Sequence, residues 1–159
     1  MGGFCHRSRL AFIAVSALLL FAQPLVVFGD GMHSKVRTVY VPVYSHVYTG
    51  NRALPVNLAT TLSIRNTDPS NRITVASAEY FNSEGRLIRR MLAKPVTLGP
   101  LASTSIFIKE KDTAGGFGAS FLVRWHAARE VSPPVIECLM IGAYSGLGIS
   151  FVSPGQEIR

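Results

Sequence analysis

The residues able to bind a transition metal are few in this chain and lie far apart along it. His33, His46 and His126 carry imidazoles, and Cys138 and Met140 carry sulfur ligands that suit copper or zinc. None of them sits at a spacing characteristic of a metal site, so only tertiary folding could unite them. A copper or zinc site built from His46, His126 and either Met140 or Cys138 is therefore the alternative hypothesis. The leading hypothesis involves no cofactor.

Four rings at alternating positions form the more distinctive pattern. Tyr40, Tyr44, His46 and Tyr48 share one side of an extended segment whose other side carries valines. The valine side is expected to be buried in the core, and the other side then presents its rings to solvent or to a partner. Pro42 cannot donate a ladder hydrogen bond, which places this strand at a sheet edge. We predict that the four rings form a binding surface; the alternative is that a neighbouring loop covers them.

Three short motifs are similar to catalytic ones but lack the required context. The segment 112–115 (Asp-Thr-Ala-Gly) is similar to the loop of an aspartic protease, but it lacks the glycine that follows the threonine there. The chain also has no second copy of the loop to supply the second carboxylate. The glycine-rich segment 115–118 precedes a predicted strand, which favours a flexible turn with positive φ over a phosphate-binding loop. Ser145 is one position out of register with a nucleophile elbow, so we interpret it as a turn residue. We expect no enzyme; a hydrolase centred on Asp112, Ser145 or a histidine is the competing hypothesis.

The elements that must position these residues are short strands. No window after residue 30 shows the apolar spacing of an amphipathic helix, whereas several segments alternate with period two between clusters of Gly, Pro, Asn and Asp. Within 73–81 the alternation shifts, which indicates a β-bulge. The predicted strands cover residues 39–48, 58–65, 73–81, 86–92, 103–109, 119–126, 135–142 and 147–153.

Seven or eight short strands in about 130 residues favour an all-β fold, a two-sheet antiparallel β-sandwich of immunoglobulin or fibronectin type. We predict a single domain over residues 30–159, with Trp125 anchoring its core. Cys138 lies in an apolar run, which is typical of a buried and inert thiol.

The first 29 residues have the three parts of a secretory signal peptide. A basic start precedes an apolar stretch over 10–22, and 27–29 (Val-Phe-Gly) places small or short side chains before a cleavage site at Asp30. We therefore expect a periplasmic or secreted bacterial protein. The alternative is an uncleaved anchor over 10–28, close to the roughly 20 residues that a spanning helix needs. Contact with a membrane is expected only in that case.

The charge balance is only mildly basic. Lys and Arg number 16 against 9 Asp and Glu, for a formal net charge of +7. The densest basic stretch, from Arg86 to Lys94, is typical of solvated arginines that protect a strand edge from pairing. No recognisable nucleic-acid-binding module accompanies it, so we expect no nucleic-acid partner.

Five segments also carry a resemblance to a known family, and together they cover most of residues 38–153. These segments are 41–48, 62–68, 96–103, 115–125 and 148–151. The chain resembles an uncharacterised family of exported bacterial proteins, the domain of unknown function 3124. The resemblance implies an exported single domain, and it brings no activity, ligand or catalytic residue.

The leading hypothesis is a non-enzymatic β-sandwich module of the periplasm or cell envelope. It would bind another protein or a cell-surface component through Tyr40, Tyr44, His46, Tyr48 and the adjacent loops. Binding along such an edge strand could use added-strand pairing.

Overall fold

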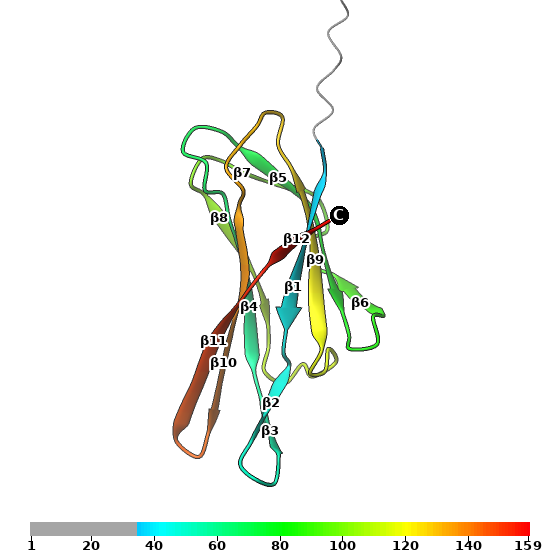
Figure 1. Ribbon diagram of the computed structural model, residues 1–159, viewed down its shortest axis with the longest axis vertical. Coiled ribbons are helices and arrows are strands. Elements are labelled where there is room, and N and C mark those ends of the chain that lie inside the picture. The colour runs from blue at the N-terminus through cyan, green and yellow to red at the C-terminus, as the bar shows by residue number, and fades with distance from the viewer. Residues whose placement is uncertain (1–34) are drawn as a thin grey trace, which may run out of the picture. The chain divides into compact units, whose positions relative to one another are not determined.

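A computed structural model describes residues 35–159, and the predicted signal peptide at 1–29 lies outside the described residues. Every regular element in this part of the chain is a β-strand, and all pairings between strands are antiparallel (Figure 1). The prediction of an all-β fold is confirmed. No helix in the described part is long and apolar enough to cross a membrane.

Residues 35–159 contain twelve strands instead of the seven or eight that the sequence predicted. In chain order they are β1 (Arg37–Val43), β2 (His46–Thr49), β3 (Leu54–Asn57), β4 (Ala59–Arg65), β5 (Ile73–Phe81), β6 (Leu87–Arg90), β7 (Val96–Leu98), β8 (Ser103–Ile108), β9 (Ala119–His126), β10 (Val135–Tyr144), β11 (Leu147–Pro154) and β12 (Gln156–Ile158).

These strands form three antiparallel sheets. The first sheet has the order β12-β1-β9-β5-β6, and β7 pairs with the opposite end of β5 from β6. The second sheet has the order β11-β10-β4-β8, and β2 and β3 form a separate hairpin. Loops connect the two larger sheets repeatedly, since β4 and β5 are consecutive in the chain but belong to different sheets (Figure 1).

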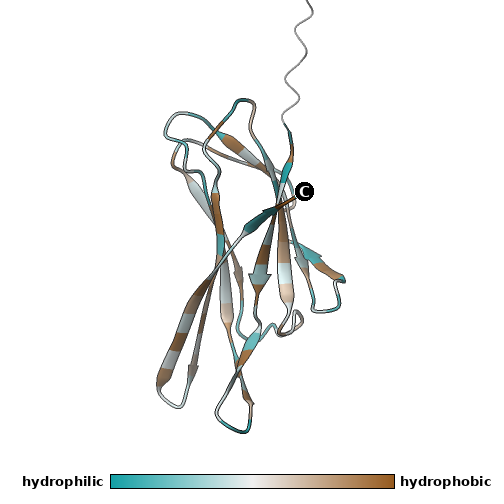
Figure 2. Cartoon of the chain, viewed as in Figure 1, coloured by the Kyte–Doolittle hydropathy of each residue, from teal (hydrophilic) through white to brown (hydrophobic). Residues whose placement is uncertain are grey.

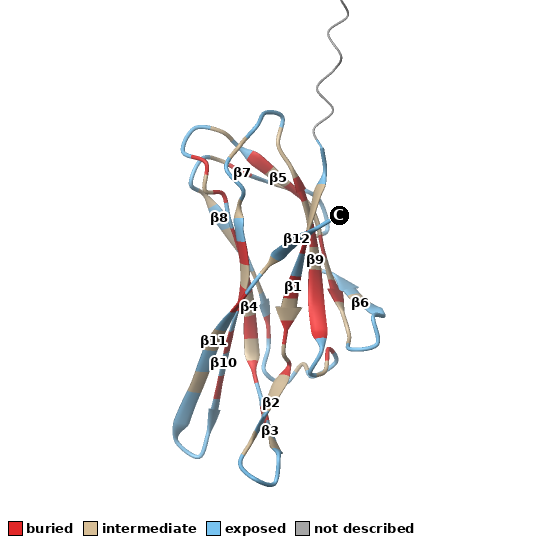
Figure 3. Ribbon diagram, in the orientation of Figure 1, coloured by how far each residue is buried: buried red, intermediate tan, exposed pale blue. Residues whose placement is uncertain are grey.

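Residues from both larger sheets form one hydrophobic core. The inward side chains of β4, Leu62 and Ile64, are fully buried, and the intervening residues of that strand are more exposed (Figure 3). Trp125 is 2% exposed, which confirms its predicted place in the core. Cys138 is a free, fully buried thiol whose pKa is raised to about 12, chiefly by burial.

Two local predictions in and after β5 agree with the structure. The register between β5 and β9 shifts between Val75 and Ser77, so the change in alternation does mark an irregularity of the strand. The following turn returns the chain into β6, with Gly85 at a φ of 73°. Glycine adopts this left-handed conformation without the steric cost that a Cβ would add.

The long first strand that the sequence predicted is interrupted. β1 ends at Val43, and the chain then leaves the sheet to form the β2–β3 hairpin. The backbone of Ser45 bonds outside any ladder, because its N–H donates to the carbonyl of Gly116 at 3.1 Å and its carbonyl accepts from Leu58 N–H at 3.0 Å. Tertiary hydrogen bonds therefore replace strand pairing at this point.

The edge position predicted for this strand is also wrong for its first half. β12 pairs with residues 38–40 of β1, so β1 lies between β12 and β9 there. Pro42 lies beyond the last residue that β12 reaches, where β1 has β9 as its one sheet neighbour. The missing N–H of Pro42 is thus tolerated without the whole strand lying at an edge.

β12 exists because the chain crosses from the second sheet to the first at Gly155. Its N–H donates to the carbonyl of Ile136 at 2.8 Å. A Cβ on Gly155 would lie 2.6 Å from that oxygen and 2.6 Å from Val39 Cγ1. Glycine is needed here for close approach of the backbone, a requirement that strand periodicity does not reveal.

Candidate binding site, an aromatic cluster

Three of the four predicted site rings pack around the ring of Phe117, which comes from the glycine-rich loop. The ring of Phe117 lies 5.1 Å from that of Tyr44, 6.1 Å from His46 and 5.8 Å from Tyr48, measured between centroids. Phe151 of β11 packs on the Tyr44 ring at 5.7 Å. We call these five residues the aromatic cluster. Most of the contacts have the edge-on or tilted geometry that aromatic pairs prefer.

Hydrogen bonds hold the imidazole of His46 in a fixed orientation. The Ser45 hydroxyl donates its one proton to the carbonyl of Gly116 at 2.9 Å, so towards His46 Nδ1, at 3.3 Å, it acts as acceptor. In the neutral form of the ring this arrangement requires the proton on Nδ1, so that Nε2 accepts from the Tyr48 hydroxyl at 3.2 Å. Both ring nitrogens are engaged within the protein.

The loop that presents Phe117 is held on both sides by serines. Ser45, buried at the start of the β2–β3 hairpin, binds the carbonyl of Gly116 through both its backbone and its hydroxyl. On the other side, the Ser83 hydroxyl donates to the carbonyl of Gly115 at 3.1 Å and accepts from Gly118 N–H at 2.9 Å. These bonds fix the backbone of Gly115, Gly116 and Gly118, and they thereby position Phe117 between them.

The glycines of this loop are required by packing and by backbone conformation. A Cβ on Gly115 would collide with the Tyr80 hydroxyl and with Ala119. Gly116 has a φ of 78°, so the positive φ expected for this loop is present. Burial raises the pKa of Tyr80, which keeps its hydroxyl protonated beneath the loop.

Part of the aromatic cluster remains accessible. Tyr48 is 56% exposed and Phe117 is 47% exposed, whereas Tyr44, His46 and Phe151 are partly buried. The alternative that a neighbouring loop covers the predicted rings therefore holds in part, because Phe117 packs against them. That loop also adds a half-exposed ring of its own to the surface.

Tyr40 lies apart from the aromatic cluster. It is on β1, between Leu122 of β9 and Gln156 of β12, and is 37% exposed. The break after β1 directs His46 and Tyr48 onto another sheet, so the alternating pattern does not continue across it. Three of the four predicted rings meet, and the fourth does not join them.

The structure does not bring together the residues of the metal hypothesis. His46 lies near the Ala119 end of β9 and His126 at its other end, seven residues and about 23 Å along the strand. Cys138 and Met140 are fully buried on β10. Within 35–159 no group of three or more His, Cys, Asp and Glu side chains is placed to hold a metal ion. His33 lies outside the described residues.

The residues of the hydrolase alternative also lie in structural roles. Asp112 forms an ion pair with Arg89 of β6 at 2.6 Å. Ser145 has a φ of 49° and is followed by Gly146 at 80°, in the two-residue turn between β10 and β11. Two successive residues with positive φ are typical of a tight hairpin turn. The interpretation of Ser145 as a turn residue is confirmed.

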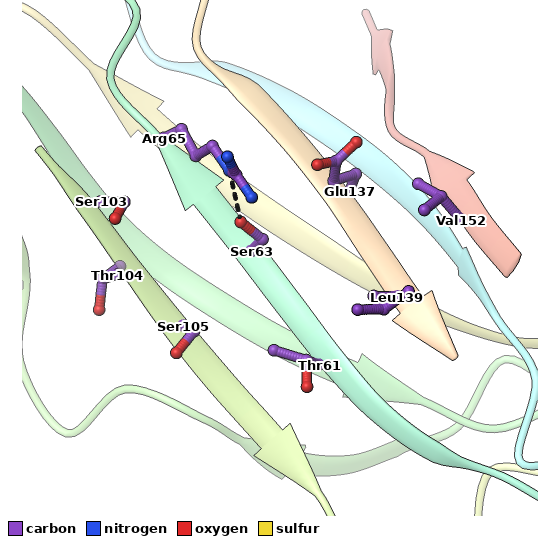
Figure 4. A pocket seen from close by; sticks show the side chains of 9 residues that line it. All are labelled: Thr61, Ser63, Arg65, Ser103, Thr104, Ser105, Glu137, Leu139 and Val152. Carbon is purple, nitrogen blue, oxygen red and sulfur yellow. Dashed lines mark hydrogen bonds between the residues drawn. The ribbon is translucent and has the colours of Figure 1, made fainter. Parts of the chain in front are cut away.

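An open hollow lies on the outer face of the second sheet. It has a volume of about 520 Å³ and is lined by five hydroxyl side chains, by Arg65 and Glu137, and by Leu139 and Val152 (Figure 4). Arg65 Nε donates to the Ser63 hydroxyl at 3.0 Å along the same strand (Figure 4). The hollow is open and is lined only by strands of one sheet. The aromatic cluster, in contrast, joins residues from three separate segments of the chain.

Comparison with known proteins supplies the family of the chain. Residues 36–158 match the family model described as protein of unknown function (DUF3124). The chain belongs to this family. The DUF3124 match includes all five residues of the aromatic cluster. No curated protein matches the chain.

Among solved structures, the chain is similar to the crystal structure of Thermotoga maritima 1070. The two share 11% sequence identity with a TM-score of 0.44, over 76% of this chain and 92% of the other.

Sequence reasoning missed Phe117 and Phe151 as members of the site. A usable signal existed for Phe117, because a large ring between Gly116 and Gly118 in a loop is exposed unless a neighbouring element covers it. Phe151 gave no such signal, because it occupies an ordinary alternating position of a strand.

Proposed function

We propose that this chain is a non-enzymatic binding module of the bacterial periplasm or cell envelope, which holds a partner protein or another envelope component on the aromatic cluster. The observation that carries the proposal is the pair of half-exposed rings, Phe117 on a loop held by Ser45 and Ser83, and Tyr48 hydrogen-bonded to His46. The signal-peptide pattern of residues 1–29 supports the export that this proposal requires.

Prepositioned rings suit binding for an energetic reason. Aromatic side chains bury a large area when a partner binds. The affinity of an interface is reduced by the entropy that is lost when mobile side chains become ordered on binding. Here Ser45 and Ser83 hold the loop, and the His46–Tyr48 hydrogen bond holds the ring of Tyr48. A partner that contacts this surface would meet rings that are already ordered.

The strand order supports a scaffold of immunoglobulin type. In such domains one sheet has the order A-B-E-D and the other C-F-G. With β1, β4, β5, β9, β10 and β11 as strands B to G, the order β1-β9-β5 corresponds to B-E-D and β4-β10-β11 to C-F-G. The departures are that β12, from the C-terminus, takes the place of A, that β8 adds a strand beside C, that β6 and β7 add strands beside D, and that β2 and β3 form a separate hairpin.

The test is a comparison of matched variants in capture from solubilised envelope extract. The double variant Tyr48→Ala/Phe117→Ala removes the exposed rings, and Tyr40→Ala, an exposed ring outside the aromatic cluster, is the control. We expect the component retained by the wild type to bind the double variant at least about tenfold more weakly, the loss typical of central aromatic contacts. Tyr40→Ala should bind like the wild type.

Two outcomes would contradict the proposal. Equal retention by the wild type and the double variant would show that the aromatic cluster is not the binding surface. Equal loss in Tyr40→Ala would show that the effect is not specific to the cluster. Turnover by the purified protein in a broad ester, peptide and glycoside screen would contradict the non-enzymatic role.

A further inference from the structure

The longest run without charge in the second half of the chain forms one edge of the second sheet. No charged residue occurs between Glu137 and Glu157, in a protein with a formal net charge of +7. This run contains all of β11 and residues 138–144 of β10, and β11 pairs with β10 alone among the described strands. Its other edge is paired with no strand of residues 35–159, which leaves the outward backbone groups on that edge without a ladder partner.

At the other ends of the two larger sheets, the edge strands contain or adjoin charges of the kind that usually prevent pairing between copies. β6 includes Arg89 and Arg90, and Glu157 of β12 pairs with Arg37 at 3.7 Å. β8, at the opposite edge of the second sheet, is followed directly by residues 109–112, all of them charged. Natural sheets protect their edges in this way against edge-to-edge association. β11 has no such protection.

The surface beside this edge is apolar as well. Val152 of β11 lies opposite Leu139 of β10 in the ladder, and Ile141 is the next outward residue along β10. Val152 and Ile141 are each 52% exposed and Leu139 is 37% exposed. Figure 2 shows the hydrophobic bands of this hairpin, which extends past the last residue that pairs with β4. An apolar strand edge next to an apolar sheet face is typical of an interaction surface.

We infer that β11 pairs antiparallel with β11 of a second copy of this chain, which joins the two second sheets into one continuous sheet. A two-fold arrangement places the same strand edge of both copies together, so a charge near the two-fold axis would lie close to the like charge of the other copy. The absence of charge makes β11 suited to pairing with itself. Val152 of each copy then gains cross-strand apolar neighbours.

Two serines on opposite edges of the second sheet provide a matched test. Ser150 of β11 and Ser105 of β8 are both exposed and lie on edge strands of the same sheet. Sedimentation equilibrium of the purified protein should show a dimer. Ser150→Lys places like charges in the shared edge, and we expect its dimer dissociation constant to rise at least about tenfold. Ser105→Lys should dimerise like the wild type.

Hydrogen exchange keeps the inference testable if Ser150→Lys fails to fold. In the wild type, backbone amides of 147–154 should exchange more slowly at high than at low protein concentration, while those of β8 should be unchanged. A wild type that is monomeric at all concentrations would overturn the inference. So would equal loss of dimer in both lysine variants, or concentration-independent exchange in β11. Phe151 of the aromatic cluster lies on β11, but the exposed rings that carry the proposed function, Tyr48 and Phe117, lie on other segments. Failure of these measurements would therefore leave the proposed function standing.

Discussion

Asp68 is a nearly buried carboxylate held mainly by backbone amides. Its Oδ1 accepts from the N–H groups of Ser70 at 2.9 Å and Asn71 at 2.7 Å, and its Oδ2 accepts from Ser132 N–H at 3.2 Å. The neighbouring Asn66 side chain donates to the carbonyl of Gly99 at 2.7 Å. Together these bonds tie three loops at one end of the strands. The amide of Ser70, followed by that of Asn71, holds the pKa of Asp68 below its usual 3.8.

Asp68→Asn should destabilise the protein in a way that depends on pH. The new amide would direct an N–H group at the N–H of Ser132 or lose the paired bonds at Oδ1. Because the folded protein lowers the pKa, the carboxylate stabilises the fold above about pH 3.8, and this contribution is lost as the pH falls through the lowered value.

Urea unfolding, followed by the fluorescence of the single tryptophan, Trp125, measures the effect. The wild type should exceed Asp68→Asn in stability at pH 7, and the difference should shrink below pH 3.8. The exposed Glu110→Gln is the control and should show little change at either pH. A difference between wild type and Asp68→Asn that stays constant with pH would contradict the argument.

At the scale of elements, the main difference between sequence and structure is the break after β1. Alternation predicts one extended segment over 39–48, and the side chains there do suit a strand. The chain turns because Ser45 bonds to Gly116, which is 71 residues away in the sequence. Strands such as β4 and β9 were predictable because alternation alone reports their buried faces. The short strands β7 and β12 depend on partners that the local pattern does not contain.

Ser83→Ala should loosen the loop that presents Phe117. The variant loses the hydroxyl contacts to Gly115 and Gly118, while the backbone bond from Ser83 N–H to the Gly115 carbonyl, at 3.0 Å, remains. We expect a loss of about 1 kcal/mol in the free energy of unfolding. Hydrogen exchange at the amide of Gly118 should become faster, and Ser105→Ala, on an exposed part of β8, should leave it unchanged. Unchanged exchange at Gly118 in Ser83→Ala would show that the serine does not hold the loop.

At the scale of the whole molecule, Cys138 reports on global unfolding. The thiol is fully buried in the shared core, and its pKa of about 12 leaves almost no thiolate at neutral pH. We expect alkylation of Cys138 only at the rate at which the two sheets separate, and therefore far faster in denaturant. Peptide mapping by mass spectrometry distinguishes Cys138 from Cys5. Rapid labelling of Cys138 in native buffer would contradict the burial of this strand.

The sequence alone determined the all-β class, the faces of the principal strands, the irregularity in β5 and the burial of Trp125 and Cys138. These features follow from a period of two residues, which is a local property of the chain. The tertiary structure alone decided that Phe117 and Phe151 join Tyr44, His46 and Tyr48, that Tyr40 does not, and that His46 and His126 lie apart. Such meetings depend on hydrogen bonds and sheet pairings between distant segments, and no local pattern encodes them.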